Sequence, residues 1–492
     1  MAGERRLVLS LALIFLVSLP AVTTRLYSSD EIEYFAWVRS LWFDRDLSFD
    51  NEYRYFYERG VAQGARVRED GTGLYGGSFR RTFLEATTPT GLRINFAPIG
   101  SALLWSPFYI LADTGVRIAR ALGSPVAADG FSQPYITATT YASALYGLLA
   151  IVLSLVAVRR ISGAVDWTFG AIWLGTPLVF YMYVAPGFSH ATSAFVVAAF
   201  YVAWLHVREQ WSLKGVAALG AIAGVMAMVR EQDVFIAIGP ALDYAVHAVR
   251  AARGGTTTFR VSVGRAAAGI AAFVVCFLPQ AISYLVLYGR LGPHQSVEQK
   301  MHWLAPYALQ VLASPTHGFV FWTPLAVPAL TGLVLLALGR ASRDPSPGGT
   351  ASLAWIGAVS LLMAASQIYV SGSVASWEGG AFGQRRLVSL TVFLVIGLAS
   401  LFRVVRSTWP RRALVAVVVI CTWWNLALVA QFGTGLMNRQ RLELSTNAYH
   451  AFITVPRALP ELAWRYVFDR QSFYRGRGAA GAMEAAPSLD GR

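Results

Sequence analysis

Long apolar runs separated by short polar turns dominate the sequence. Each run is continuously apolar over about 20 residues, the length that an α-helix needs to cross a bilayer. A membrane β-barrel would instead alternate apolar and polar residues. The pattern therefore predicts an all-α, polytopic membrane protein with about 11 transmembrane helices. The predicted spans are 7–25, 135–158, 164–184, 189–207, 213–230, 234–250, 266–288, 317–339, 352–371, 387–403 and 413–431.

Two connections are long enough to hold structure of their own, at residues 26–134 and 289–316. Within the first, residues 97–112 are apolar, but the segment is short for a span and contains Pro98 and Pro107. We expect an interfacial or re-entrant helix there, in a loop that holds juxtamembrane helices.

The arginines support this topology. With the N-terminus in the cytoplasm and 97–112 outside the count of spans, every inward turn is basic, as the positive-inside rule requires. Counting 97–112 as a span would move most of those arginines outside. We therefore expect a multi-pass protein of the cytoplasmic (inner) membrane, with a transmembrane domain at 1–431 whose loop 26–134 faces the periplasm or exterior. The tail at 432–492 is predicted to lie on the same outer face as a short helical cap.

Composition narrows the class of protein further. Hydrophobic residues make up 55% of the chain and charged residues 14%, which no soluble domain of this size would show. The net charge of +14 lies mostly in the inward turns, so nucleic acid is not an expected partner, and the lipid bilayer is. Cys276 and Cys421 both lie inside apolar runs and indicate neither a disulfide framework nor a metal site.

Two adjacent carboxylates, Asp30 and Glu31, follow the first apolar run and open the long outer loop. A carboxylate at the membrane–water boundary can act as the general base that takes a proton from an acceptor hydroxyl. Apolar residues such as Ile32 and Phe35 recur at helical spacing and predict a short amphipathic helix that begins at the carboxylates. A structural role fits as well, because Ser28-x-x-Glu31 is a capping-box pattern. Capping needs only one acid, so Asp30 and Glu31 are both candidate catalytic residues.

Arg230 ends an apolar run that is rich in small residues. One structural interpretation is a local ion pair with Asp233, and another is a long side chain that reaches the membrane interface. The functional interpretation is contact with a phosphate group, which a guanidinium binds through two parallel hydrogen bonds.

Arg385 and Arg386 end a glycine-rich outer loop at residues 377–386. Glycines let the backbone approach a ligand closely, and the two arginines would hold an anionic head group. The structural interpretation is a flexible turn with interface anchors. Two arginines on the outer side depart from the positive-inside trend, which favours a functional role.

His190 and Lys300 are further candidates on the outer side. A lone histidine at a helix start is most often just a polar helix end. No cluster of His, Asp and Glu has metal-ligand spacing, so the sequence identifies no metal site and no certain cofactor, and a divalent metal stays open. The chain also has no P-loop and no Rossmann glycine pattern, which argues against nucleotide hydrolysis inside the cell.

At these residues the chain resembles the GT-C superfamily of membrane glycosyltransferases, especially bacterial relatives of the protein O-mannosyltransferases and of the lipid A aminoarabinose transferases. The stretch 30–41, followed by 44–47, is similar to the Asp-Glu motif, the juxtamembrane helix and the turn after it in that family. Residues 95–104 resemble its proline-containing segment, and the Arg230 and Arg385-Arg386 regions are similar to further elements. Many relatives carry a lysine before the first-loop proline, whereas this chain has Phe96 and Ala97 there.

The resemblance implies a transferase that moves a sugar from a polyprenyl-phosphate donor to a hydroxyl of a glycolipid, glycan or protein at the outer face of the membrane. Asp30, with Glu31, would activate the acceptor hydroxyl. Arg230, Arg385 and Arg386 would contact the donor phosphate, and Arg93 would replace the missing lysine. The lipid tail would lie in a groove between helices.

A lipid-linked saccharide transporter or flippase is the alternative function, because it would also be polytopic and would bind polyprenyl phosphates. Such a protein would place charges along a central cavity within its spans and often shows an internal repeat. This chain keeps nearly all of its charges at helix ends. A polysaccharide polymerase or ligase would favour a large outer loop late in the chain, and a non-catalytic scaffold would leave Asp30 and Arg385 without a purpose.

Overall fold

The computed structural model describes residues 2–61, 79–163, 167–255, 258–341 and 347–473. Across these residues the chain is helical and forms no β-strand, which confirms the predicted all-α membrane fold. Seven of the described helices are long and apolar enough to cross a membrane. They are α5 (Gln133–Ser162), α8 (His190–Val207), α10 (Ile238–Arg253) with the 3-10 helix Glu231–Ala237 before it, α11 (Phe259–Tyr288), α16 (Pro347–Gly372), α17 (Thr391–Val404) with the 3-10 helix Arg385–Leu390 before it, and α18 (Thr408–Thr434).

Three more predicted spans are apolar but shorter helices: α1 (Ala2–Ser18), α9 (Leu213–Val229) and α15 (Ala326–Ala337). The predicted span 164–184 is wrong as a continuous helix, because it divides into α6 (Thr168–Gly175) and α7 (Leu178–Tyr183). Thr176 between them is extended, at φ −130° and ψ 165°. Pro177 explains the break, since proline disfavours a helical conformation in the residue before it.

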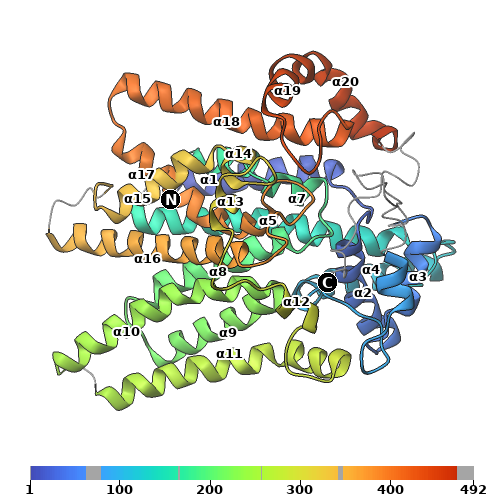
Figure 1. Cartoon of the computed structure of the whole chain (residues 1–492), viewed down its shortest axis with the longest axis horizontal. Coiled ribbons are helices and arrows are strands. Elements are labelled where there is room, and N and C mark those ends of the chain that lie inside the picture. Colours follow the sequence, from blue (N-terminus) through green and yellow to red (C-terminus); the bar gives the residue numbers. More distant parts are fainter. Residues whose placement is uncertain (1, 62–78, 164–166, 256–257, 342–346, 474–492) are drawn as a thin grey trace.

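The two ends of the helix bundle differ as the positive-inside rule predicts. The end of α10 and the starts of α11, α16 and α18 lie together on the left of Figure 1. These ends carry most of the inward-turn arginines. The helices of the long loops lie towards the opposite end, on the right of Figure 1: α2 (Ser29–Arg39), α3 (Asp50–Glu58), α4 (Gly100–Ala121) and α12 (Gln295–Gln299). We call this opposite end the outer end.

Small residues bring the central helices close together. α17 lies at the centre, since 89% of its most apolar stretch is buried, compared with 22% for α11 and for α18. Gly332 of α15 faces Gly397 of α17 so closely that an added Cβ would lie 1.8 Å from the Gly397 carbonyl oxygen. Gly220 of α9 meets Gly269 of α11 in the same way. Such close approach is typical of helix packing in membranes, where van der Waals contact replaces the hydrophobic effect.

The first part of α4 holds residues 100–112 of the apolar segment 97–112, and α4 does not count among the spanning candidates in the described chain. The Trp105 indole donates to Thr192 Oγ1 at the start of α8, at 3.2 Å. Further along α4, Asp113 accepts a hydrogen bond from the Tyr135 hydroxyl at the start of α5, at 2.7 Å. A Cβ on Gly100 would meet the backbone of Met228, at the end of α9. α4 is thus anchored on the outer ends of three membrane helices, as expected of a helix that does not span.

α2 begins at the two carboxylates, as predicted, but it is not amphipathic. Its residues from Glu31 to Arg39 are all buried, on every face of the helix. The prediction considered only the apolar spacing, whereas α3, α4 and the outer ends of the membrane helices enclose α2 from several sides. A buried helix can position side chains more rigidly than a helix on the bilayer surface.

The remaining helices complete the outer end. In the second long loop and after it lie α13 (Ala308–Leu312) and α14 (Phe319–Trp322), and the tail forms α19 (Leu444–Tyr449) and α20 (Val455–Phe468). Arg470, just past α20, donates to the carbonyl oxygens of Pro20 and Val22, at 2.7 and 2.8 Å. The described part of the tail is therefore fixed to the last residues of the α1 segment.

Candidate active site

The first turn of α2 separates the roles of the two adjacent carboxylates. Glu31 closes a capping box with Ser28, whose side chain accepts a hydrogen bond from the Glu31 backbone N–H. The Glu31 carboxylate in turn accepts from the backbone N–H groups of Tyr27 and Ser28, at 2.9 and 3.1 Å. Its side chain is buried, and this burial raises the pKa of Glu31 to about 7 although the three hydrogen bonds oppose the shift. Glu31 is therefore engaged in holding the helix start.

Asp30 points instead into a polar cavity at the outer end of the bundle. Its carboxylate forms an ion pair with Arg385, with 2.7 Å between Oδ2 and Nη1. The cavity has a volume of about 230 Å³ and is lined by Asp30, Glu33, Tyr34, Phe96, Ala97, Ser296, Val297, Lys300, Met301, Val374, Ser376, Arg385 and Arg386. Four of the predicted residues, Asp30, Lys300, Arg385 and Arg386, thus meet in one place.

The glycine-rich loop brings the two arginines to this cavity. Its backbone is left-handed at Gly379, Gly380, Ala381 and Gly383, a conformation that glycine adopts without strain. A Cβ on Gly379 would lie 3.4 Å from Arg386 Nε, so the absence of a side chain leaves room for the guanidinium. Arg386 Nη2 donates to the Ser376 carbonyl at 3.1 Å, while its Nε is shielded from solvent and has no hydrogen-bond partner among the described residues.

Arg230 lies next to this pair of arginines and is hydrogen-bonded to α8 and to the arginine segment itself. Its Nη1 is 2.7 Å from His190 Nδ1 at the start of α8, and 3.3 Å from the Arg385 carbonyl oxygen. Because the guanidinium can only donate, His190 Nδ1 is the acceptor and the ring proton is on Nε2. The local Arg230–Asp233 ion pair does not form among the described contacts, since the Asp233 carboxylate accepts from Ser193 Oγ at 2.5 Å.

Glutamines lock the backbone of the arginine segment. Gln232 donates to the Arg386 carbonyl oxygen at 2.8 Å, and Gln367 of α16 donates to the Gln232 carbonyl oxygen at 3.0 Å. These hydrogen bonds, together with those of Arg230, join α8, α16, the 3-10 helix before α10 and the glycine-rich loop. Neither glutamine stood out in the sequence, because Gln367 is a single polar residue in an apolar run and Gln232 lies between the charged residues Glu231 and Asp233.

Glu33 is a cavity residue that the sequence motif contained but that we did not single out. Its Oε2 accepts from the backbone N–H groups of Phe96 and Ala97, at 2.6 and 3.1 Å, and so ties α2 to the segment before α4. Burial, and then the negative charge of Asp30, raise the pKa of Glu33 well above its ordinary value. The signal was present in the sequence, because residues i and i+3 of a helix share one face, and Asp30 and Glu33 have that spacing.

The balance of charge in the cavity is positive. Lys300, Arg385 and Arg386 line it, with Asp30 and a Glu33 side chain whose raised pKa favours the neutral form. Burial and the neighbouring Arg386 lower the pKa of Lys300, which shows how closely the cations are placed. A site with an excess of guanidinium and ammonium groups around one carboxylate is suited to a phosphate ester.

Arg93 lies outside the cavity. It pairs with Asp50 of α3, at 2.8 Å, and its Nη1 donates to the Ala86 carbonyl oxygen at 3.2 Å. These contacts fix the first loop to α3. The structure therefore does not bring Arg93 together with the other predicted phosphate ligands.

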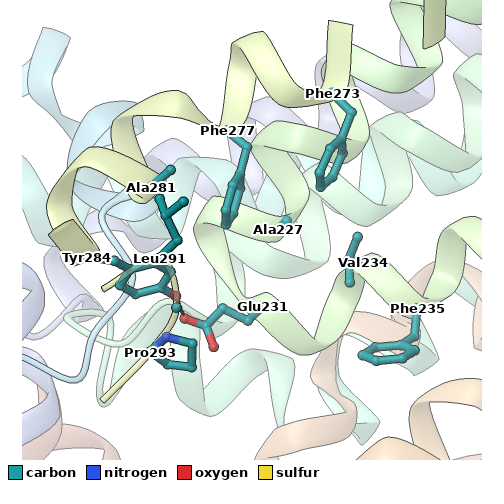
Figure 2. Close-up of a pocket in the computed structure, with 11 residues that line it drawn as sticks. Ala227, Glu231, Val234, Phe235, Phe273, Phe277, Ala281, Tyr284, Leu291 and Pro293 are labelled. Atoms are coloured by element: carbon teal, nitrogen blue, oxygen red, sulfur yellow. Dashed lines mark hydrogen bonds between the residues drawn. The ribbon is translucent and has the colours of Figure 1, made fainter. Parts of the chain in front are cut away.

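An apolar cavity of about 380 Å³ lies on the other side of the Arg230 segment, between the 3-10 helix that precedes α10 and α11. Figure 2 shows Phe273 and Phe277 projecting from α11 toward Val234 and Phe235, with Leu291 and Pro293 near one end. Glu231 and Tyr284 point toward one another there and are hydrogen-bonded. Glu231 directly follows Arg230, so the apolar cavity begins one residue away from the cationic group of the site.

No group of three or more His, Cys, Asp and Glu side chains in the described part of the chain is arranged to hold a metal ion. The carboxylates that are close in space, Asp30 and Glu33, have an arginine and two backbone N–H groups as partners. The arrangement can bind an anion and take up a proton from a hydroxyl beside it.

Comparisons with known proteins find a solved structure that aligns with this chain but no match to its sequence. No protein-family model matches the sequence, and no curated protein matches it either. The structure aligns with "Crystal Structure of ArnT from Cupriavidus metallidurans in the apo state" over 98% of this chain and 77% of that chain, with a TM-score of 0.47 and 14% sequence identity. At this level of similarity the alignment assigns neither a family nor an activity to this chain.

Proposed function

We propose that this protein is a GT-C-type glycosyltransferase that moves a sugar from a polyprenyl-phosphate donor to an acceptor hydroxyl at the outer face of the cytoplasmic membrane. The observation that carries the proposal is the polar cavity in which Asp30 lies beside Arg385, Arg386 and Lys300. It combines a base with an anion site at the outer end of a bundle of membrane-spanning helices. The acceptor is a glycolipid, a glycan or a protein.

Asp30 is the proposed general base. Its carboxylate takes the proton of the acceptor hydroxyl as that oxygen attacks the anomeric carbon of the donor sugar. The bond between the anomeric carbon and the phosphate oxygen breaks, polyprenyl phosphate leaves with the bonding electron pair, and an in-line attack inverts the anomeric configuration. The ion pair with Arg385 holds the Asp30 carboxylate in a defined orientation, which favours attack from one direction.

The arginines are the proposed phosphate ligands. Negative charge grows on the departing phosphate in the transition state, and preoriented cations stabilise that charge most effectively where water is excluded. Arg386 has a shielded Nε–H to offer, and Arg385 and Lys300 flank it. Arg230, positioned by His190 and the Arg385 backbone, adds a positive charge behind them.

The apolar cavity of Figure 2 is the proposed entry for the polyprenyl tail. Its walls are aromatic and aliphatic side chains of α11 and of the 3-10 helix before α10, and both segments belong to the membrane-spanning set. Because Glu231 in this cavity directly follows Arg230, a lipid chain there would bring its phosphate toward the arginines. Phenylalanine side chains such as Phe273 and Phe277 suit the flat, unsaturated units of a polyprenyl chain.

The test is sugar transfer by the purified protein in nanodiscs, with a panel of radiolabelled polyprenyl-phosphate sugars and a membrane extract as acceptor. Asp30→Asn is expected to reduce transfer by about 10²- to 10⁴-fold, because a general base is lost while the size of the side chain is kept. Glu31→Gln is the matched control, because the amide oxygen can still accept the capping hydrogen bonds, and it should retain transfer. Equal activity of Asp30→Asn and wild type would refute the mechanism.

A donor-binding measurement tests the arginines separately. Arg385→Ala and Arg386→Ala should each weaken donor binding by about ten- to a hundredfold, the value of a hydrogen bond to a charged group. Arg93→Ala should leave donor binding unchanged, since Arg93 lies outside the cavity. Donor that binds but is never transferred by wild type, with labelled donor moving across the membrane, would instead establish the lipid-linked saccharide transporter.

A further inference from the structure

A second and larger apolar cavity lies on a different side of the molecule, away from the Arg230 segment. It has a volume of about 760 Å³ and is formed between α1, α6, α18 and α20. Along α1 it extends from Leu7 to Ser18, a length of roughly 16 Å at the helical rise per residue. A cavity this long and apolar between membrane helices has the dimensions of a lipid acyl chain.

The outer rim of this cavity is polar and basic. Arg439 and Arg470 line it, together with tyrosines that include Tyr27 and Tyr183, and its described lining contains no Asp or Glu. Arg470 is fixed there by hydrogen bonds to the Pro20 and Val22 carbonyl oxygens, which carry no net charge. A positive rim above apolar walls matches an amphiphile with an anionic head group.

The other end of the cavity reaches the arginine-rich side of the bundle, where Leu7 and Trp167 line it. The walls between the two ends are mainly aliphatic and aromatic side chains of α1, α6 and α18, without a charged group among the described lining residues below the rim. Gly170 near the start of α6 and Gly433 at the end of α18, close to the rim, both line the cavity, and a Cβ added to either glycine would meet nothing within 4 Å. The open space is therefore bounded on two sides by residues that have no side chain to fill it.

We propose that this cavity binds one anionic glycerophospholipid, with an acyl chain along α1 and the phosphate at Arg470 and Arg439. The site is separate from the proposed transferase cavity and does not depend on the sugar-transfer reaction. It joins α20 of the tail to α1 and α18 through the lipid. Tyr27 lines the site and directly precedes the Ser28 cap of α2, so bound lipid would also steady the helix that carries Asp30.

The test is native mass spectrometry of the delipidated, purified protein after addition of phosphatidylglycerol or phosphatidylcholine with identical acyl chains. Wild type is expected to bind one phosphatidylglycerol at least ten times more tightly than phosphatidylcholine. Gly170→Leu and Gly433→Leu, tested singly and together, fill the cavity without a clash and should each weaken phosphatidylglycerol binding by at least tenfold. Gly264→Leu is the matched control, since Gly264 is a glycine of α11 outside this cavity whose added Cβ also meets nothing within 4 Å.

A separate variant, Arg470→Gln, tests whether the cavity prefers an anionic head group. Arg470→Gln should lower the preference for phosphatidylglycerol over phosphatidylcholine toward one, while the binding of phosphatidylcholine stays as it was. Equal binding of phosphatidylglycerol to wild type and to the filled double variant would overturn the site. Equal affinity of wild type for the two lipids would overturn the anionic head group. A lipid-free dimer by light scattering that dissociates in the filled variant would assign the cavity to a second copy of the chain, and also overturn the proposal.

Discussion

Asp30 and Glu31 are neighbours in the first turn of α2, but their side chains have different roles. Successive residues of a helix point about 100° apart, so the Glu31 carboxylate turns back to the cap while Asp30 faces the cavity. The cap also constrains how Glu31 titrates. Burial raises its pKa from 4.5 to about 7, so between these values the folded protein binds more protons than the unfolded chain. Folding stability contributed by Glu31 is therefore complete below pH 4.5 and is lost as the pH rises toward 7.

The fall in folding stability with rising pH leads to a prediction for Glu31→Gln, because a glutamine at this position does not titrate. The unfolding temperature of wild type, relative to Glu31→Gln, should fall as the pH is raised from 4.5 to 7, by the equivalent of at most about 3 kcal/mol. Thermal unfolding of the two proteins in the same detergent, over a series of pH values, measures the difference. A constant difference over that range would show that Glu31 keeps an ordinary pKa.

At the scale of an element, α4 acts as a brace between the first loop and the membrane helices. Gly100 at its start touches the end of α9, where an added Cβ would lie 2.4 Å from the Met228 carbonyl carbon. Gly100→Ala should destabilise the protein by about 1–3 kcal/mol, because backbone on both sides must move apart. Gly115→Ala in the same helix meets nothing within 4 Å and should be neutral or stabilising by up to about 1 kcal/mol.

Thermal unfolding and sugar transfer of these two α4 variants test whether the contact between α4 and α9 supports the site. Residues 95–99 lead directly into Gly100 and hold Glu33 of the cavity through the backbone at Phe96 and Ala97. Transfer should therefore fall in Gly100→Ala and not in Gly115→Ala. Equal effects of the two substitutions would mean that the close contact with α9 does not matter.

At the scale of the whole molecule, the arginine-rich helix ends and the proposed site lie at opposite ends of the bundle (Figure 1). The positive-inside rule then predicts that the site faces the exterior. In a background with Cys276 and Cys421 replaced by Ala, Thr87→Cys in the first loop should react with a membrane-impermeant thiol reagent in intact cells. Ser407→Cys, at the start of α18, should react only after the membrane is permeabilised. Labelling in the reverse pattern would invert the topology and exclude a donor on the outer leaflet.

What the sequence determined by itself are the properties that depend on local composition. Apolar run length, the basic turns and the Ser28-x-x-Glu31 cap were sufficient to predict the helical class, most of the spans and the start of α2. They also predicted that residues 97–112 do not span the membrane. Each of these follows from how a short segment partitions between water and lipid or satisfies its own backbone. The break at Thr176 was not predicted, although Pro177 disfavours a helical conformation in the residue before it.

Only the tertiary structure decided which candidates form a site. Asp30 and Arg385 are 355 residues apart in the chain, and their contact depends on how α2 and the glycine-rich loop are packed and rotated. The same packing places Arg93 beside Asp50 and away from the cavity. Helix rotation in a membrane is set by side-chain contacts between helices, since lipid and apolar side chains are equally hydrophobic. Those contacts join distant parts of the chain, and no pattern within one segment records them.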